Sequence, residues 1–590
     1  MLPLLAIISM SSCSKNDDSE SSNVNNPIEG DPSNMHEQEI IVTVDANGNA
    51  SEGHSFTRID ETNFYIDNLK YTASDGGLIV SGYDPVFFSG TARIISKLIY
   101  NGRTIEVKSI GNEAFKDCKE ITSAFIGRGV ERIGRSSFYR CIALTSIVIP
   151  ESVVNIDNSA FSSCVSLNSI NIPNSVDKIG EYCFSGNSNL TSVTIGNSIT
   201  NISPNMFSGC TSLNSIKVGS DNNKYDSRDK CNAIIETKSN TIVLGCKSTT
   251  ITSSVKTIGN DAFKGCTGLK SLLIPSNIIG IEESAFEDCA GLITVDIPNS
   301  ITSINRSVFS GCNSLKTVNV PNSVKNIDDN AFKDCTALNS ITIGNNVESI
   351  SRRAFSGCNA LDTVTINSNA ILSSANYYYK IADMFGSQVK CYNIGEGVAT
   401  IGEYAFYDCS RLTNVNIPNS VTSICRSAFA WCPNLTSVNI PISVTSIESG
   451  TFDRCTSLEA IIIPNSVTSI GEWAFRETRL SSITIPNSVS SIGANAFKSC
   501  YSLTSVTIGN AITYIGTSAF SGCIQLTDVY CYTENISSSP YGGPSSYFYN
   551  TSVSNGTLHV PSNSIEKYKA ARPWNEFKTI VALTDSDPKP

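Results

Sequence analysis

A phenylalanine recurs every 23 residues along most of this chain, and this period constrains the fold more than any other feature. It holds through three runs of phenylalanines, with one step of 22 in the last run. Self-similarity at a period of about 20 to 50 residues indicates stacked coils, each packed only against its neighbours. The runs are Phe115, Phe138, Phe161, Phe184 and Phe207; then Phe263, Phe286, Phe309, Phe332 and Phe355; then Phe406, Phe429, Phe452, Phe475, Phe497 and Phe520.

Each coil carries a phrase close to IPNSVTSI, and the coil LEAIIIPNSVTSIGEWAF at 458–475 shows how it is expected to fold. We expect Ile461 and Ile463 on one face of a short strand, which Pro464 ends because proline cannot donate to a strand ladder. A turn leads to a second extended stretch, and EWAF then forms one helical or 3₁₀ turn that brings Phe475 to the interior. The sequence therefore predicts a β-rich solenoid with one short helical or 3₁₀ turn per 23-residue coil.

The cysteines follow the same period. Fourteen of the 21 lie three residues after a repeating phenylalanine. Equivalent residues of stacked coils are about 4.8 Å apart, which is longer than the ~3.8 Å between the Cβ atoms of a good disulfide. We expect a ladder of buried, reduced thiols, and disulfides between neighbouring coils are the alternative.

Two insertions interrupt the period. The first, at about 219–250, contains the apolar runs AIIE and TIVLG, which predict a β-hairpin. Cys231 and Cys246 flank it and could form a disulfide, while SDNNKYDSRD is rich in calcium-ligand types but lacks calcium-loop spacing. The second, at about 367–390, is expected to be a loop that carries Tyr377, Tyr378 and Tyr379. These tyrosines either recognise a partner or pack over the edge of the neighbouring coil.

Composition excludes several classes of function. The net charge of −11 argues against nucleic acid as a partner. All three histidines lie outside residues 111–523, so the repeats have no imidazole for general base catalysis or metal binding. The sequence shows no phosphate-binding loop, no Ser/His/Asp set and no metal-ligand cluster. We therefore expect a protein that is not an enzyme and needs no cofactor or metal.

The N-terminal segment is expected to direct export. Residues 1–12 include a ten-residue apolar run, and Cys13 follows two serines. This arrangement resembles a bacterial lipoprotein signal, in which the mature chain begins at a lipid-modified cysteine, although no Lys or Arg precedes the apolar run. Residues 13–38 are rich in Ser, Asn, Asp and Glu, which predicts a flexible stalk. Acidic residues directly after the cysteine resemble a signal for display on the outer face of the outer membrane.

The units of the type IPNSVTSIGEYAF..C..L resemble the BspA-like leucine-rich repeat proteins of bacterial cell surfaces. The insertion NKYDSRDKCNAIIETKSNTIVLGC resembles a variant module of those arrays, and GTLHVPSNSIEKYKAARPWNEFKTIV resembles their C-terminal closing segment. The resemblance implies a leucine-rich repeat solenoid over 110–530. Small β and β/α segments over 39–109 and 531–590 are then expected to cap its two ends.

The resemblance also implies a function in adhesion. The expected partners are host extracellular-matrix or cell-surface proteins, or other bacterial surfaces, and the membrane is contacted only through the lipid anchor. The outward residue of each first strand forms a track of Thr and Asn side chains, which either bind a partner or serve strand pairing alone. A glycan-capturing lipoprotein and a structural or antigenic spacer are the alternative functions. The candidate residues of this track are Asn171, Thr194, Asn319, Thr342, Asn416, Asn439, Thr484, Thr507 and Tyr530.

Overall fold

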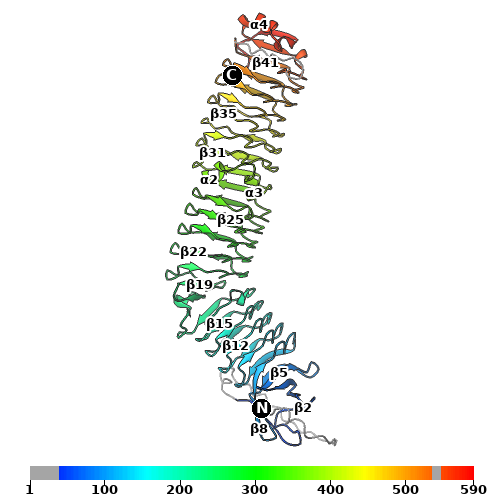
Figure 1. Cartoon of the computed structure of the whole chain (residues 1–590), viewed down its shortest axis with the longest axis vertical. Coiled ribbons are helices and arrows are strands. Elements are labelled where there is room, and N and C mark those ends of the chain that lie inside the picture. Colours follow the sequence, from blue (N-terminus) through cyan, green and yellow to red (C-terminus); the bar gives the residue numbers. More distant parts are fainter. Residues whose placement is uncertain (1–38, 535–545) are drawn as a thin grey trace. The chain divides into compact units, whose positions relative to one another are not determined.

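The computed structural model describes residues 39–534 and 546–590. The expected signal peptide, the lipid-anchor residue Cys13 and the stalk lie outside the described residues. The chain forms two compact units, unit 1 up to Leu292 and unit 2 from Ile293. Each unit is a stack of coils (Figure 1). Most coils contribute one short strand to each of two parallel ladders, and the two units together contain about 20 coils. The predicted β-rich solenoid is confirmed.

Unit 1 begins with an antiparallel meander. Strands β2 to β5 pair in chain order, β5 then pairs parallel with β8, and β7 pairs antiparallel with β8 and parallel with β1. The meander thereby covers the first coil and supplies the first strand of its sheet. The bounds are β1 Ile41–Val44, β2 Phe56–Arg58, β3 Asn63–Ile66, β4 Leu69–Ser74, β5 Gly77–Tyr83, β6 Gly90–Ile94, β7 Lys97–Tyr100 and β8 Arg103–Ile110.

The coils of unit 1 continue both sheets in parallel register. First strands pair as β6–β9–β11 and β13–β15–β16, and second strands as β8–β10–β12–β14. From β8 and β9 onward each paired residue lies 23 positions from its partner, as Ile133 and Ile156 do, whereas β6 pairs with β9 at a spacing of 32, as Ala92 and Ala124 do. The bounds are β9 Ile121–Ile126, β10 Arg132–Ile133, β11 Ser146–Val148, β12 Asn155–Ile156, β13 Ser169–Asn171, β14 Lys178–Ile179, β15 Ser192–Ile195, η2 Pro204–Phe207, β16 Ser215–Val218, β20 Thr257–Ile258, β21 Ser271–Leu272 and β22 Gly280–Ile281.

The first insertion is a β-hairpin, as its two apolar runs predict. Strand β18 pairs antiparallel with β19, β17 pairs with the other edge of β18, and β19 pairs parallel with β20 of the following coil. The hairpin is therefore part of the sheet of second strands. Cys231 and Cys246 are buried free thiols, so the disulfide alternative does not hold for them. The bounds are β17 Tyr225–Asp226, η3 Arg228–Lys230, β18 Ile234–Glu236 and β19 Thr241–Leu244.

Unit 2 repeats the same two-strand coil. Its first strands pair in the order β23–β25–β27–β29–β30–β32–β34 and, further on, β37–β39–β41–β42–β43. The bounds of the first strands are β23 Thr294–Asp296, β25 Thr317–Asn319, β27 Ser340–Ile343, β29 Thr363–Ile366, β30 Cys391–Ile394, β32 Asn414–Asn416, β34 Ser437–Val438, β37 Ser482–Ile485, β39 Ser505–Ile508 and β41 Asp528–Cys531. The second strands are β24 Ser303–Ile304, β26 Asn326–Ile327, β28 Ser349–Ile350, β31 Thr400–Ile401, β33 Ser423–Ile424, β35 Ser446–Ile447, β36 Ser469–Ile470, β38 Ser491–Ile492 and β40 Tyr514–Ile515.

The second insertion is more ordered than a loop. Two one-turn helices, α2 (Asn369–Ser373) and α3 (Ile381–Phe385), flank the tyrosines. Ser368 caps α2 by accepting a hydrogen bond from the N–H of Ile371 at 3.1 Å, which the sequence analysis did not recognise. Phe385 stacks on Phe355 with ring centroids 5.0 Å apart, so the insertion keeps the column of phenylalanines in place.

The coil at 458–475 departs from the expected strand. Residues 459–463 are outside any strand, although Ile463 is buried as predicted. The step from Phe475 to Phe497 is 22, so the following coil is one residue short. The N–H groups of Arg479 and Ser481 donate to the carbonyls of Leu458 and Glu459 in this coil. The ladder of first strands is interrupted here, between β34 and β37.

The C-terminal segment adds two strands to the sheet and closes the phenylalanine column. β42 and β43 pair parallel beyond β41. Phe548 stacks on Phe520 at 5.8 Å, and the buried side chains of Trp574 and Phe577 pack against the Phe548 ring. The bounds are η5 Val553–Asn555, β42 Thr557–Val560, η6 Ser562–Ser564, α4 Ile565–Ala570, η7 Trp574–Glu576 and β43 Thr579–Ala582.

The turn at each phenylalanine combines ring stacking with backbone pairing. In the coil of Phe115, the N–H groups of Glu113, Phe115 and Asp117 donate to carbonyls of the next coil at 2.9, 2.7 and 2.8 Å. Glu113 and Asp117 are left-handed, with φ of 60° and 59°. The expected 3₁₀ turn occurs at η2, where Pro204 fixes φ and lacks an N–H group. In most other coils the alternating left-handed residues direct the N–H groups to the next coil instead.

The cysteine ladder has a defined bonding role. The thiol of Cys141 donates to the carbonyl of Phe115 at 3.0 Å, and Cys335 does the same to Phe309 at 3.1 Å. All cysteines of the described part of the chain are free. These thiols give a buried phenylalanine carbonyl of the preceding coil a second hydrogen bond, beside the backbone N–H that it already accepts. The expected ladder of reduced thiols is confirmed. The same bond is made by Cys164, Cys210, Cys289, Cys358, Cys432, Cys455, Cys500 and Cys523.

Candidate partner-binding surfaces

The Thr and Asn track lies on the outward face of the first strands. In unit 1, Asn171 is paired in register with Thr194, and both side chains are exposed. In unit 2, the exposed Asn319 is paired with the half-buried Thr342. Thr484 is also exposed and is paired with Thr507 of β39, which is paired in turn with Tyr530 of β41. These residues form a polar face of short side chains.

Several members of the track are already engaged with the protein itself. The amide of Asn416 donates to the side chain of Asn393 in the preceding coil at 2.6 Å. The side chain of Asn439 accepts from the N–H of Ile417 at 3.2 Å and donates to its carbonyl at 2.6 Å, so it continues the ladder where β34 ends. These contacts favour the alternative in which the track serves strand pairing.

Two members are not free to bind a partner. Thr507 was expected to face outward, but its side chain is only 4% exposed. Thr507 is paired in register with Thr484 on one side and with Tyr530 on the other. The large ring of Tyr530 therefore stands beside it on the adjacent strand. Tyr530 stacks on His559 of β42 with ring centroids 4.3 Å apart. The expectation that Thr507 is a contact residue is therefore wrong.

The three tyrosines of the second insertion form part of a larger cluster. Tyr377, Tyr378 and Tyr379 are 53%, 73% and 54% exposed and lie between α2 and α3. Tyr377 packs edge-on against Tyr404 at 5.5 Å and also contacts Tyr407 at 6.1 Å, both from the next coil. The tyrosines thus extend over the neighbouring coil and remain open to solvent, so both sequence-based alternatives describe them in part.

Cations fix these rings. The ammonium of Lys380 lies 5.0 Å from the centroid of Tyr377 and 4.6 Å from that of Tyr407. The guanidinium of Arg352 lies 4.5 Å from the centroid of Tyr379 and donates to the carbonyl of Tyr378. A cation over an aromatic face is attracted by the ring quadrupole, and this attraction restricts the side chains without burying them.

Aromatic and arginine side chains continue along the following coils. The guanidinium of Arg454 lies 4.2 Å from the Trp431 ring, and Trp431 is 41% exposed. Arg476 lies 5.7 Å from the ring of Trp473, which is 38% exposed, and it pairs with both oxygens of Asp453 at 2.7 and 2.8 Å. We call this surface of unit 2 the aromatic edge. It consists of Arg352, Tyr377, Tyr378, Tyr379, Lys380, Tyr404, Tyr407, Trp431, Arg454, Trp473 and Arg476.

Three aromatic residues of this edge occupy unfavourable backbone positions. Tyr404, Trp431 and Trp473 are left-handed, with φ of 55°, 62° and 55°. Most equivalent positions of the other coils hold Ser, Asn, Asp or Gly, as Ser427 and Gly450 do, although Glu113 and Tyr182 are also left-handed. Bulky residues rarely adopt this conformation. Exposed aromatic rings kept at strained positions are typical of functional surfaces.

Sequence reasoning missed the tryptophans and arginines of this edge. A usable signal was present, because two of the three tryptophans of the chain lie two residues from a repeating phenylalanine. Trp431 follows Phe429, and Trp473 precedes Phe475. These residues stand at outward positions of the turns, which the alternation of the strand face does not reveal.

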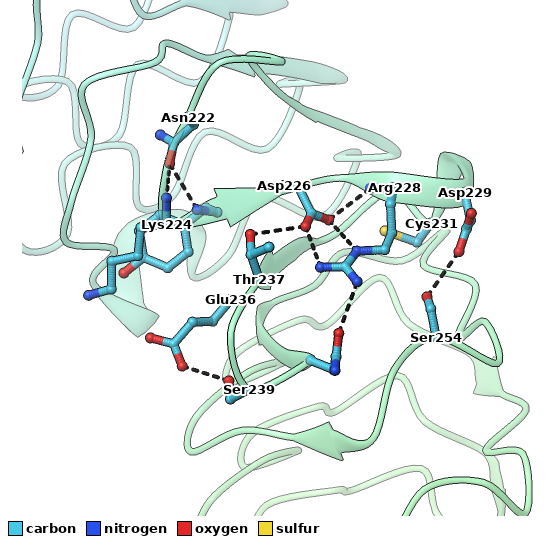
Figure 2. Close-up of polar contacts among 12 residues, drawn as sticks. Asn222, Lys224, Asp226, Arg228, Asp229, Cys231, Glu236, Thr237, Ser239 and Ser254 are labelled. Carbon is cyan, nitrogen blue, oxygen red and sulfur yellow. Dashed lines mark hydrogen bonds and ion pairs between the residues drawn. The ribbon is translucent and has the colours of Figure 1, made fainter.

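The Asp- and Asn-rich part of the first insertion is a closed polar network (Figure 2). Asp226 forms an ion pair with Arg228 and accepts a hydrogen bond from the Thr237 hydroxyl at 3.1 Å. Arg228 also donates to the side chain of Asn240 at 2.9 Å. Asp229 accepts from the Ser254 hydroxyl at 2.9 Å. These carboxylates are used to fix the hairpin, which supports the interpretation of the segment as a turn over that of a calcium site.

Burial also suppresses the reactivity of the thiol ladder. Desolvation raises the pKa of Cys409 and of Cys455 to about 12. Desolvation likewise raises the pKa of Cys210 and of Cys266 to about 12. A thiol that stays protonated is a poor nucleophile and a poor metal ligand. The ladder is therefore a structural element.

These features define a class of protein: a repetitive β-solenoid whose distinctive surface is a row of exposed aromatic and basic side chains. The sequence matches the BspA type leucine-rich repeat region, a family model of six repeat copies, over residues 108–229, 243–362, 325–458, 383–503 and 445–571. The chain belongs to this family. No curated protein matches the sequence. No helix of the described segments has the length and apolar character required to cross a membrane.

Solved structures of other bacterial proteins are similar to parts of the chain. A leucine-rich repeat protein from Bacteroides ovatus has 26% identity and a TM-score of 0.41, covering 76% of this chain and 98% of that chain. A leucine-rich cell surface protein from Faecalibacterium prausnitzii has 23% identity and a TM-score of 0.35, covering 54% and 97%. The pneumococcal vaccine antigen PcpA has 19% identity and a TM-score of 0.42, covering 58% and 93%.

Proposed function

We propose that the protein is a non-enzymatic lipoprotein, anchored at Cys13 in the outer membrane and displayed on the cell surface, which binds protein partners through the aromatic edge. The partners are host extracellular-matrix or cell-surface proteins, or the surfaces of other bacteria. The function is adhesion and co-aggregation. It needs no cofactor and involves no nucleic acid, in keeping with the net charge of −11.

The observation that carries this proposal is the composition of the aromatic edge. Tyr, Trp and Arg are the residue types that dominate binding energy at protein interfaces. Here they are gathered on unit 2, and Trp431 and Trp473 remain exposed despite their strained backbone. Among the candidate residues of the Thr and Asn track only Tyr530 is of these types, and its ring stacks on His559. Asn416 and Asn439 use their amides within the protein.

A large number of copies on one cell would compensate for weak binding by each molecule. The rings of the edge are largely exposed, as Tyr378 is at 73%, so a single molecule is expected to bind with modest affinity. Many copies anchored on one cell engage a partner surface together, and each later contact is then effectively intramolecular. Adhesion of whole cells can consequently be strong while the isolated chain binds weakly.

The location is tested by protease treatment of intact cells. The proposal predicts that fragments of the repeats are released while a periplasmic marker protein stays intact. A Cys13→Ala variant should lose incorporation of radiolabelled palmitate and appear in the soluble fraction. Full protection of the wild-type chain from the protease, with the cells intact, would contradict surface display.

A further inference from the structure

A polar hollow adjoins the tyrosines of the aromatic edge. It has a volume of about 260 Å³ and lies in unit 2 between the turn after Phe355 and helix α3. Hydrogen-bonding groups line most of it, and the backbone at Gly357 and Gly386 completes the wall. The polar side chains that line it are those of Arg352, Ser356, Asn359, Asp383 and Gln388.

The lining offers donors and acceptors in balance. Arg352 supplies guanidinium donors, and Asn359 can donate and accept. The carboxylate of Asp383 accepts the N–H of Lys380 at 3.2 Å and keeps further acceptor capacity for a ligand. The amide of Gln388 donates to the carbonyls of Cys358 and Phe385 at 3.1 and 2.8 Å, which holds this side chain in place. Its oxygen accepts no hydrogen bond from the residues that the structure describes, so it is available to a ligand.

Arg352 connects the hollow to the exposed rings. Arg352 is one of the residues that line the hollow, and its guanidinium lies 4.5 Å from the centroid of Tyr379 and donates to the carbonyl of Tyr378. Tyr378 and Tyr379 are 73% and 54% exposed. A ligand that fills the hollow can therefore extend directly onto aromatic surface.

We propose that this hollow and its two tyrosines bind a neutral pyranose sugar at the end of a glycan chain. A pyranose presents hydroxyls in several directions, which the mixed donors and acceptors of the hollow match. Its C–H groups carry partial positive charge and stack on the negative face of an aromatic ring. The site goes beyond the protein-binding function proposed above and does not depend on it.

Charge and shape favour this class of ligand over others. A sialic acid or a phosphate would place its anionic group near the carboxylate of Asp383, which opposes the attraction of Arg352. An apolar peptide side chain would leave the polar groups of the hollow without partners. A neutral, hydroxyl-rich ligand avoids both costs.

The test is a glycan array probed with the full-length protein. Because one pyranose in an open site binds with a Kd on the order of 1 mM, the array must be dense or the protein presented in several copies. One arm of the array carries galactose-, mannose-, fucose- and N-acetylhexosamine-terminated host glycans. The other carries bacterial capsular polysaccharides and peptidoglycan fragments.

Binding to neutral glycans in either arm supports the proposal, and the arm that responds identifies the source. Tyr378→Ala and Asn359→Ala should each lower the signal about tenfold, since each removes one contact of the ligand. Tyr514→Ala is the matched control, because Tyr514 is 55% exposed and lies outside the hollow and the aromatic edge. It should bind like the wild type.

Three results would overturn the proposal. They are the absence of binding to any neutral glycan, binding confined to sialylated or sulfated glycans, and binding that survives both variants. Circular dichroism and the melting temperature show whether each variant is folded. A protein partner that is lost in Tyr378→Ala, with no glycan bound by the wild type, would assign the tyrosines to the protein interface instead.

Discussion

Two side chains that repeat together, the phenylalanine and the thiol three residues later, organise each coil. Phe332 is fully buried, and its ring stacks between Phe309 at 5.4 Å and Phe355 at 5.2 Å. The thiol of Cys335 donates across the coils to the carbonyl of Phe309. One residue therefore fills the core and the other satisfies a buried backbone group.

Phe332→Ala is expected to lower the free energy of unfolding by roughly 3–5 kcal/mol, because the ring leaves a cavity between two rigid neighbours. Phe332→Leu should cost less, since leucine refills part of that volume. Denaturant titration followed by circular dichroism measures both. A loss below about 1 kcal/mol for the alanine variant would show that the stacked column is not the core of the coil.

The thiol ladder predicts a loss of stability in alkali. In the unfolded chain a thiol ionises near its ordinary pKa of 9.0, whereas burial raises the pKa of Cys455 in the folded chain to about 12. Above pH 9 the folded state therefore holds the proton that the unfolded state loses, and stability falls as the pH rises. Each such thiol contributes a slope of about 1.4 kcal/mol per pH unit between these values.

Comparing the wild type with Cys455→Ala separates the contribution of this thiol to the pH dependence of stability from that of Tyr and Lys side chains, which also titrate in this range. The variant should lose stability less steeply between pH 9 and 12, by the slope of one thiol. The native wild type should also leave a thiol reagent unreacted at pH 8. Equal slopes for the two proteins would contradict the assignment of Cys455 as a buried, neutral donor.

Strain at the aromatic edge can be tested at Trp431, whose φ is 62°. Trp431→Asn and Trp431→Val both remove the ring and its contact with Arg454. Asparagine tolerates the left-handed conformation and valine does not, so the asparagine variant should be more stable by roughly 1–2 kcal/mol. Equal melting curves would mean that the turn relaxes and that the wild-type position is unstrained.

At the residue scale, sequence reasoning placed the buried positions correctly and the exposed ones poorly. The buried phenylalanines, thiols and alternating isoleucines recur with the repeat, and each occupies the same packing environment in every coil. Their burial could therefore be predicted from the period alone. Thr507 and Asn439 share the pattern of the track, but a neighbouring tyrosine and the end of a strand decide their environment. Such effects depend on the adjacent coil and cannot be found within one repeat.

Among the elements, the corner between successive coils is the most crowded. A Cβ atom added at Gly471 would lie 2.5 Å from the backbone nitrogen of Ser449 and 2.7 Å from the carbonyl carbon of Glu448. Backbone atoms cannot move aside as the end of a flexible side chain can. The glycine therefore allows the corners of neighbouring coils to approach closely.

Gly471→Ala is expected to destabilise unit 2 by about 1–3 kcal/mol through this overlap. Gly76→Ala is the matched control, because a Cβ there would meet nothing within 4 Å. Thermal unfolding of both variants makes the comparison. A melting temperature for Gly471→Ala equal to that of the control would show that the corner can open without cost.

Elements were predictable where apolar runs marked them. The hairpin β18–β19 follows from two such runs separated by four polar residues. Helices α2 and α3 were missed because each is a single turn, held by caps and by contacts with neighbouring coils. The strand expected at Ile461–Ile463 is absent although this coil carries the same apolar pattern as its neighbours, so a pairing defect of this kind is invisible within the coil itself.

For the whole molecule, the repeat yields two surfaces with different chemistry. The strand face carries mainly short polar side chains, and Asn416 and Asn439 bond to neighbouring coils. The turns of unit 2 carry the exposed aromatic and basic residues, together with the polar hollow. Stability is spread over many similar coils, so the turns can accept strained residues such as Trp431 and Trp473 at limited cost.

The measurement that tests the central claim most directly compares these two surfaces. Cells that display the wild type, a Trp431→Ala/Trp473→Ala variant or an Asn319→Ala/Thr342→Ala variant are applied to immobilised matrix proteins, epithelial cells and partner bacteria. Equal surface amounts are verified with an antibody. Our account predicts that the tryptophan variant loses most of its adhesion while the strand-face variant adheres like the wild type. The reverse pattern would contradict it and assign binding to the strand face.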